Sequence, residues 1–94
     1  MTVTVGELRV GATADSVLPT ATAAVAEMAN VEAADVGVRR GRAQLTVRFT
    51  GDDDETAMQL GAHVASVVDT VARVIDWSVT RRVRGDWLPV APAR

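Results

Sequence analysis

The stretch 36-VGVRRGRAQLTVRF-49 contains two runs in which apolar and polar residues alternate, separated by the turn-forming segment 39-RRGR-42. Alternation with a period of two is typical of half-buried β-strands, and a short glycine-containing connection between two such runs favours a β-hairpin. One face of this hairpin is apolar and needs a second layer over it. That face carries Val36, Val38, Leu45, Val47 and Phe49.

The segments that precede the hairpin predict a strand followed by a helix. Apolar residues alternate from Val3 to Val10, with a change of phase at Gly6 that indicates a β-bulge. Asp15 and Ser16 offer side chains for a helix N-cap. We expect this helix to start close to Ser16 and to run to residue 29 or 30.

A second helix and a last strand are predicted after the hairpin. The helix opens at the acidic run 52–55, and its apolar stripe is Leu60, Val64, Val67, Val71 and Val74, flanked by Ile75. Trp77, Val79 and Val83 then fall in the phase of one final strand. The order βαββαβ predicts an α+β two-layer sandwich of the ferredoxin-like type, an antiparallel four-stranded sheet with both helices on one face. We expect a single domain over residues 1–86 and a short Trp- and Pro-containing tail over residues 87–94.

The composition excludes several classes of protein. Of the 94 residues, 45 (48%) are hydrophobic, and 33 of these are Ala or Val. We therefore expect a core built of small side chains. The absence of Cys excludes disulfides, thiolate metal sites and thiol nucleophiles. The formal net charge of −2 argues against a dedicated DNA-binding module. No signal peptide or membrane-spanning segment is recognisable, which predicts a cytoplasmic protein without direct membrane insertion.

No catalytic, cofactor-binding or metal-binding residues are predicted. His63 is the only histidine, and no carboxylate lies three or four positions from it on its helix face. The acidic run 52–55 lacks the ligand pattern of a calcium loop and fits helix capping better. Because no constellation of titratable groups is visible, we expect the protein not to be an enzyme.

The basic side chains mark a candidate interaction surface. All ten are arginines, and seven fall in the hairpin and the last strand. On the sheet face away from the helices we expect Arg39, Arg48, Arg82 and Arg84 to bind a partner. That partner is another protein, or alternatively RNA or an anionic ligand, although RNA-binding sheets usually present aromatic rings that this face lacks.

Trp87 and Leu88 are the second candidate interaction surface. Two large apolar residues beside a proline-rich tail either fold back over the core or meet another chain. Since a core of Val and Ala buries little surface per residue, association through an edge strand or this tail would add stability. We therefore predict a homodimer.

The succession 6-GELRV-10, Val17 with Ala21 and Val25, the strand 43–49, and a Val-rich helix leading into 77-WSVTRRV-83 resembles the alkaline shock protein family of small bacterial envelope-stress proteins. The resemblance covers roughly residues 6–84. It implies a non-enzymatic cytoplasmic scaffold that associates with itself and docks on a membrane-anchored partner. The leading hypothesis from the sequence is therefore a non-catalytic, self-associating, protein-binding module, with RNA or anionic-ligand binding as the alternative.

Overall fold

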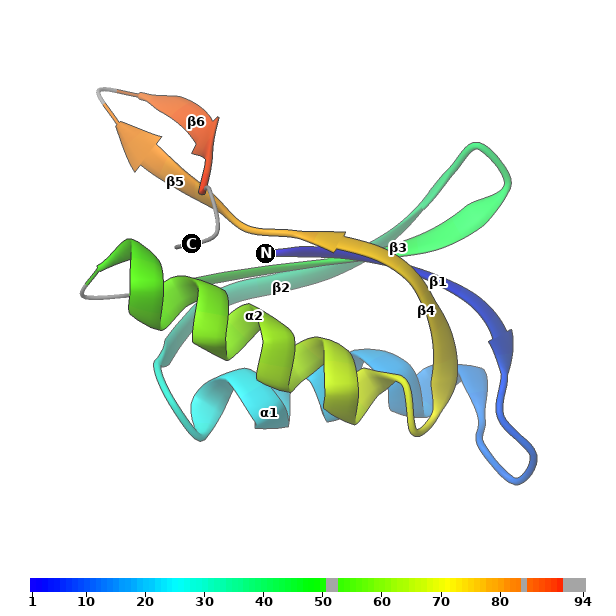
Figure 1. Ribbon diagram of the computed structural model, residues 1–94. Helices are drawn as coiled ribbons and strands as arrows, with labels where there is room; N and C mark the ends of the chain where they lie inside the picture. The colour runs from blue at the N-terminus through cyan, green and yellow to red at the C-terminus, as the bar shows by residue number, and fades with distance from the viewer. Residues whose placement is uncertain (51–52, 84, 91–94) are drawn as a thin grey trace.

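The computed structural model describes residues 1–50, 53–83 and 85–90. It is an α+β structure with two α-helices and a four-stranded antiparallel sheet, as the sequence predicts (Figure 1). The elements follow one another as β1 (Thr2–Leu8), a 3-10 turn (Ala14–Ser16), α1 (Val17–Ala26), β2 (Asn30–Arg39), β3 (Arg42–Thr50), α2 (Asp54–Val68), β4 (Ala72–Ser78), β5 (Thr80–Val83) and β6 (Asp86–Pro89).

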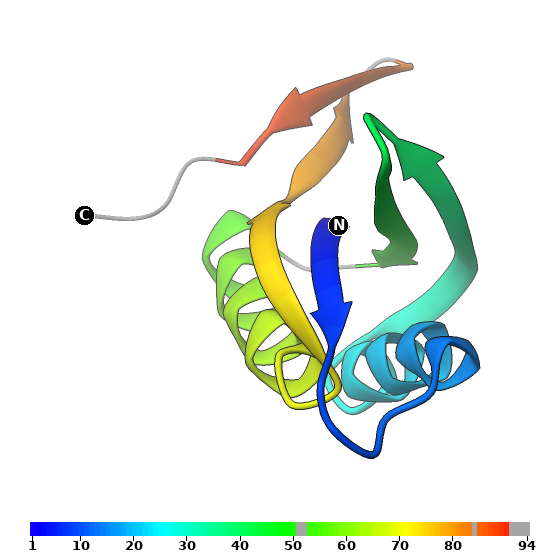
Figure 2. The same ribbon diagram turned by 90° about the vertical axis from the view of Figure 1, so that its right-hand side faces the viewer.

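The strands of the main sheet are ordered β2-β3-β1-β4, so β1 and β3 are central and β2 and β4 are the edges. Val3 pairs with Leu45 on one side and with Trp77 on the other. Helices α1 and α2 lie side by side against the same side of the sheet (Figure 2). The residues opposite one another on the helix side of the central strands are apolar, and those on the open side are mostly threonines.

The core lies between this sheet and the helices. The largest fully buried side chains come from both layers: Val3, Val25, Leu45, Val47, Leu60, Val64 and Val68. Gly61 of α2 lets the sheet approach, because a Cβ at that position would lie 2.5 Å from Cζ3 of Trp77 and 2.8 Å from Cγ2 of Val79. The small side chains expected from the composition thus allow a close contact between α2 and the end of β4.

The hairpin predicted from the alternation is present. Arg40 and Gly41 form its turn with φ values of 54° and 78°, the left-handed pair that a two-residue type I′ turn requires. The prediction that the helices cover its apolar face is wrong at the tip. Val36 and Val38 share the face of buried Leu45 but are 52% and 80% exposed, because the hairpin extends beyond the ends of the helices (Figure 1).

Both helices end earlier than the sequence predicts. α1 ends at Ala26 instead of residue 29 or 30, and α2 ends at Val68 instead of near Ile75. Val71, Val74 and Ile75 are β-branched and fit a strand at least as well as a helix. The carboxylate of Asp69 accepts a hydrogen bond from the N–H of Val74 at 2.9 Å and so stabilises the turn into β4.

The ends of the chain also differ from the expectation. Val10 is fully exposed beyond the end of β1, so it does not continue the buried face. The predicted last strand is divided into β4 and β5, and Val79 lies between them. The side chain of Val79 is buried, and its carbonyl accepts a hydrogen bond from the N–H of Val90 at 2.8 Å. β5 and β6 form a second hairpin that spans the expected boundary between domain and tail. The predicted irregularity near Gly6 corresponds to two shifts in the register between β1 and β4.

Candidate functional site

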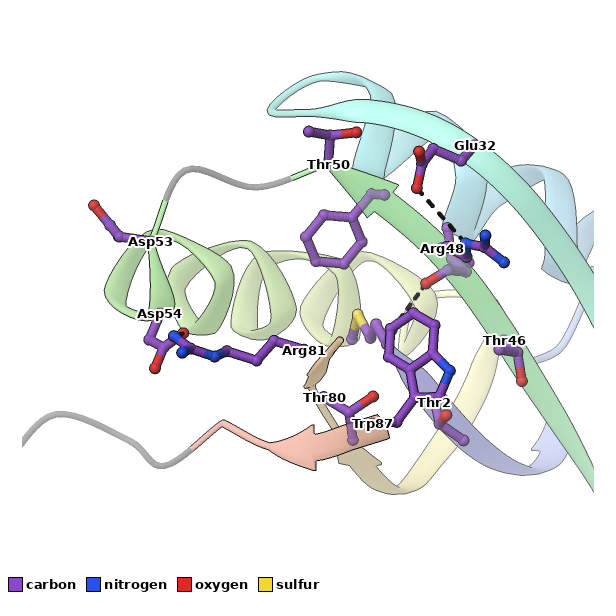
Figure 3. Close-up of a pocket in the computed structure, with 13 residues that line it drawn as sticks. Thr2, Glu32, Thr46, Arg48, Thr50, Asp53, Asp54, Thr80, Arg81 and Trp87 are labelled. Atoms are coloured by element: carbon purple, nitrogen blue, oxygen red, sulfur yellow. Dashed lines mark hydrogen bonds and ion pairs between the residues drawn. The ribbon is translucent and has the colours of Figure 1, made fainter. Parts of the chain in front are cut away.

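A groove of about 920 Å³ lies at the end of the sheet opposite the hairpin tip. It lies between the ends of β1 and β3, the beginning of α2 and the β5–β6 hairpin (Figure 3). We call it the Trp87 groove. Its lining comprises Met1, Thr2, Glu32, Thr46, Val47, Arg48, Phe49, Thr50, Asp53, Asp54, Thr80, Arg81 and Trp87.

Two arginines line the Trp87 groove, and each is paired with a carboxylate. Nε of Arg48 lies 3.7 Å from Oε1 of Glu32, and the guanidinium carbon of Arg48 is 5.8 Å from the centre of the Trp87 ring. Arg81 contacts Oδ1 of Asp54 at 3.0 Å (Figure 3). The cation above the indole ring is a cation–π arrangement, which holds the half-exposed tryptophan against the sheet.

The remaining ionisable groups of the groove are also occupied. Asp53 is the N-cap of α2, and its Oδ1 accepts the N–H of Thr56 at 2.7 Å, which lowers the pKa of that carboxyl. The Met1 ammonium donates to the carbonyl of Val47 at 2.8 Å, and burial lowers its pKa. The groove therefore combines aromatic and apolar surface with charges that are already paired.

The predicted partner-binding residues are divided between two ends of the molecule. Arg48 and Trp87 meet in the groove. Arg39 pairs in register with Arg42 at the hairpin tip. Arg42 precedes Arg48 by six residues in β3, so Arg39 and Arg48 are about 20 Å apart. The backbone of Arg82 pairs with that of Trp87, and Leu88, half exposed, pairs with Arg81.

Arg84 lies outside the described residues. Arg39 and Arg48, whose side chains are described, lie at opposite ends of β3 and do not form one continuous basic face. Acidic side chains separate them on the open side of the sheet, where Asp35 pairs with Thr46 and Asp76 pairs with Thr4.

The edge strand β2 is the second candidate surface. Nine of its ten residues are exposed, and only Val31 is half buried. In the second half of β2, Asp35, Gly37 and Arg39 lie on the open side of the sheet, and Ala34, Val36 and Val38 lie on the helix side. We call the segment Asp35–Arg39 the β2 edge.

His63 has a carboxylate partner that the sequence analysis missed. Its Nε2 lies 2.6 Å from Oε2 of Glu27, which comes from the end of α1. The two residues are 36 positions apart, so helical spacing gave no signal for the pair. The imidazole is 40% exposed and lines neither the Trp87 groove nor the smaller hollow between α2 and β4. The pair joins the two helices on their outer surface.

No family model, curated protein sequence or solved structure matches this chain. Within the described ranges, no group of three or more His, Asp or Glu side chains is arranged to hold a metal ion. None of the helices in that part of the chain has the length and apolar character needed to cross a bilayer.

Proposed function

We propose that this chain is a non-catalytic module that associates with itself and binds another protein. The observation that carries the proposal is the exposure of β2: a ten-residue edge strand whose valines share a face with the core yet lie outside it. Edge strands present unpaired N–H and C=O groups that pair readily with another chain, and proteins that stay monomeric usually block them.

The Trp87 groove supports binding of a second, different protein. Trp and Arg are enriched at protein interfaces, where a rigid aromatic ring supplies large contact area at small entropic cost. Trp87 is half exposed and Phe49 and Met1 also line the groove, so a partner could bury an apolar side chain there. Arg48 and Arg81, with their carboxylates, would form its polar rim.

The state of the ionisable groups supports a binding role over catalysis. In the described part of the groove each carboxylate caps a helix or pairs with an arginine, and His63 lies elsewhere. A general acid or base has to be free to reach a substrate. The same pairing gives less support to the RNA or anionic-ligand alternative, because Arg48 and Arg81 already have anionic partners and three carboxylates line the groove.

We also propose a narrower fold class and a cellular role for the chain. The central position of β1 and β3, with α1 and α2 in the two connections β1–β2 and β3–β4, supports a ferredoxin-like classification, to which the β5–β6 hairpin is an addition. A role as an envelope-stress scaffold of bacteria rests on the sequence resemblance alone and predicts a membrane-anchored partner.

Sedimentation velocity over a concentration range from submicromolar to hundreds of micromolar tests the self-association. We expect the weight-average mass to rise from that of one chain, 9.9 kDa, to that of two. A single 9.9 kDa species over the whole range would contradict the proposal.

A further inference from the structure

The outward-facing backbone groups of the β2 edge can be assigned from the turn. Arg39 and Arg42 close a two-residue turn and so form a hydrogen-bonded pair, after which bonded and non-bonded pairs alternate. The N–H and C=O groups of Val36 and Val38 therefore point away from β3. In agreement with this, the N–H of Val36 donates to Oδ1 of its neighbour Asp35 at 2.9 Å.

The sequence of the β2 edge is complementary to itself when it is reversed. Asp35-Val36-Gly37-Val38-Arg39 has Gly37 at its centre, a valine on each side, and opposite charges at its ends. An antiparallel second copy centred on Gly37 places Val36 opposite Val38 and Asp35 opposite Arg39 of the other chain. Opposite charges at directly opposed positions stabilise a strand pair, and like charges destabilise it.

Neighbouring registers lack this match. A shift that centres the pair on Asp35 opposes two carboxylates, and a shift that centres it on Val36 opposes Asp35 with Gly37. Both keep outward N–H groups opposite outward C=O groups, so backbone bonding alone does not choose between them. The charges choose the register centred on Gly37. Within the described residues, neither Asp35 nor Arg39 has an ion-pair partner in its own chain.

Gly37 gives an independent argument for the same centre. A glycine inside a strand weakens it and often marks a close approach of another backbone. A Cβ at Gly37 would meet nothing within 4 Å, and the residue is not among those with positive φ, so its own chain gives no reason for a glycine. At the centre of the pair, Gly37 would face its copy in a non-hydrogen-bonded position, where Cα atoms approach to about 4.5 Å.

We infer that β2 pairs antiparallel with β2 of a second copy of this chain, centred on Gly37, to form one continuous eight-stranded sheet. Val36 and Val38 exchange backbone hydrogen bonds with their counterparts, and their side chains form a four-valine cluster beyond the ends of the helices. The Asp35 carboxylate leaves the N–H of Val36 and turns to Arg39 of the second copy. This inference rests on the proposed self-association and names its site and register.

Charge reversal at the two ends of the β2 edge tests the register. Asp35→Arg gives a β2 edge with only positive ends, and Arg39→Asp gives one with only negative ends. Each variant alone should weaken its self-association by about tenfold or more, because both cross-strand pairs become repulsive. An equimolar mixture of the two variants should form a heterodimer, and the double variant Asp35→Arg/Arg39→Asp should regain a homodimer. Sedimentation velocity and native mass spectrometry distinguish these species.

The outcomes separate the register from the self-association. If the wild-type chain dimerises but the single variants dimerise equally well, or if the mixture restores nothing, the β2 register is wrong while self-association stands. If the wild-type chain is monomeric throughout, both proposals fall. The double variant carries the same side chains in exchanged positions and controls for loss of folding. Asp76→Arg, on the open side of the other edge strand β4, is a matched charge reversal that should leave dimerisation unchanged.

Discussion

The two edge strands of the sheet are protected to different degrees. β4 has seven residues and breaks register with β1 twice, its first residue Ala72 is fully buried, and Trp77 packs against Gly61 of α2. β2 has ten residues, a single irregularity near its start, and almost no buried side chain. Bulges twist an edge away from incoming strands, so β4 is less suited to pairing than the more regular β2.

The charges on β2 sharpen this contrast. Charged side chains on an edge normally repel a second chain. On β2 they are opposite in sign and symmetrical about Gly37, so an antiparallel copy meets attraction at both ends. The two edges therefore differ in specificity as well as in exposure: β4 is irregular, whereas in the proposed dimer β2 matches its own sequence.

The largest effect is expected from a glycine substitution beside β4. Gly61→Ala would place a Cβ 2.5 Å from Trp77 and 2.8 Å from Val79, and overpacking of this kind costs about 1–3 kcal/mol. Gly37→Ala on β2 is the matched control. It meets no atom within 4 Å and should leave the monomer unchanged or stabilise it by up to about 1 kcal/mol. Urea unfolding at low protein concentration measures both. Equal destabilisation by the two substitutions would contradict the conclusion that β4 packs against α2 while the β2 edge has no such contact.

Acid should loosen the beginning of β4. The N–H of Val74 and the guanidinium of Arg9 bind the carboxylate of Asp69 and lower its pKa. A depressed folded-state pKa adds stability above the ordinary aspartate value of 3.8, and that stability is lost as the pH falls through the lower folded value.

Asp69→Asn should therefore be less stable than the wild-type chain at neutral pH and should show a shallower loss of stability below pH 4. Unfolding free energies between pH 2 and 7 provide the comparison. Parallel profiles for the two proteins would show that Asp69 does not support β4.

A smaller effect is expected at the Trp87 groove. Arg48→Ala removes the cation above the indole ring, an interaction worth about 0.5–1 kcal/mol at exposed sites. The loss should fall on the β5–β6 hairpin, so amide exchange of Leu88, whose N–H faces Arg81 of β5, should accelerate several-fold while that of Leu45 stays constant. Arg39→Ala, at the other end of the sheet, is the control and should leave the exchange of both amides unchanged.

The smallest effect on the monomer is expected at the open edge. Val38→Thr keeps the β-branched shape at a position that is 80% exposed, so the unfolding free energy of the monomer should change by less than about 0.5 kcal/mol. The same substitution should weaken dimerisation measurably, because Val38 loses its apolar contact with Val36 of the second copy. A large loss of monomer stability would mean that Val38 packs within its own chain.

Local pattern predicted the parts of the fold that depend on neighbouring residues. The hairpin followed from the alternation on both sides of Arg40-Gly41, because a type I′ turn and a period of two are properties of adjacent positions. The end of α2 could not be predicted in this way, because the valines after Val68 fit a helix and a strand equally well. The hydrogen bond from the N–H of Val74 to the carboxylate of Asp69 favours the turn into β4 over a longer helix.

The candidate sites depended on long-range geometry and were predicted only in part. Trp87 and Arg48 were both predicted from the sequence as partner-binding residues. Their contact requires the β5–β6 hairpin, whereas the sequence predicted a tail from residue 87 onward because that segment is rich in proline. The exposure of Val36 and Val38 depends on where the helices end, and alternation cannot reveal that. The pairing of Glu27 with His63 joins two helices and leaves no trace in the spacing of either.

Amide hydrogen exchange at Val36 and Val38, followed by NMR at low and high protein concentration, tests the central claim most directly. In the monomer their N–H groups point away from β3, that of Val36 toward the side chain of Asp35, whereas those of Gly37 and Arg39 bind β3. We expect the protection of Val36 and Val38 to rise with concentration in step with the dimer population, while the protection of Gly37 and Arg39 is high at every concentration. Protection at Val36 and Val38 that is independent of concentration, in a sample that does dimerise, would contradict it.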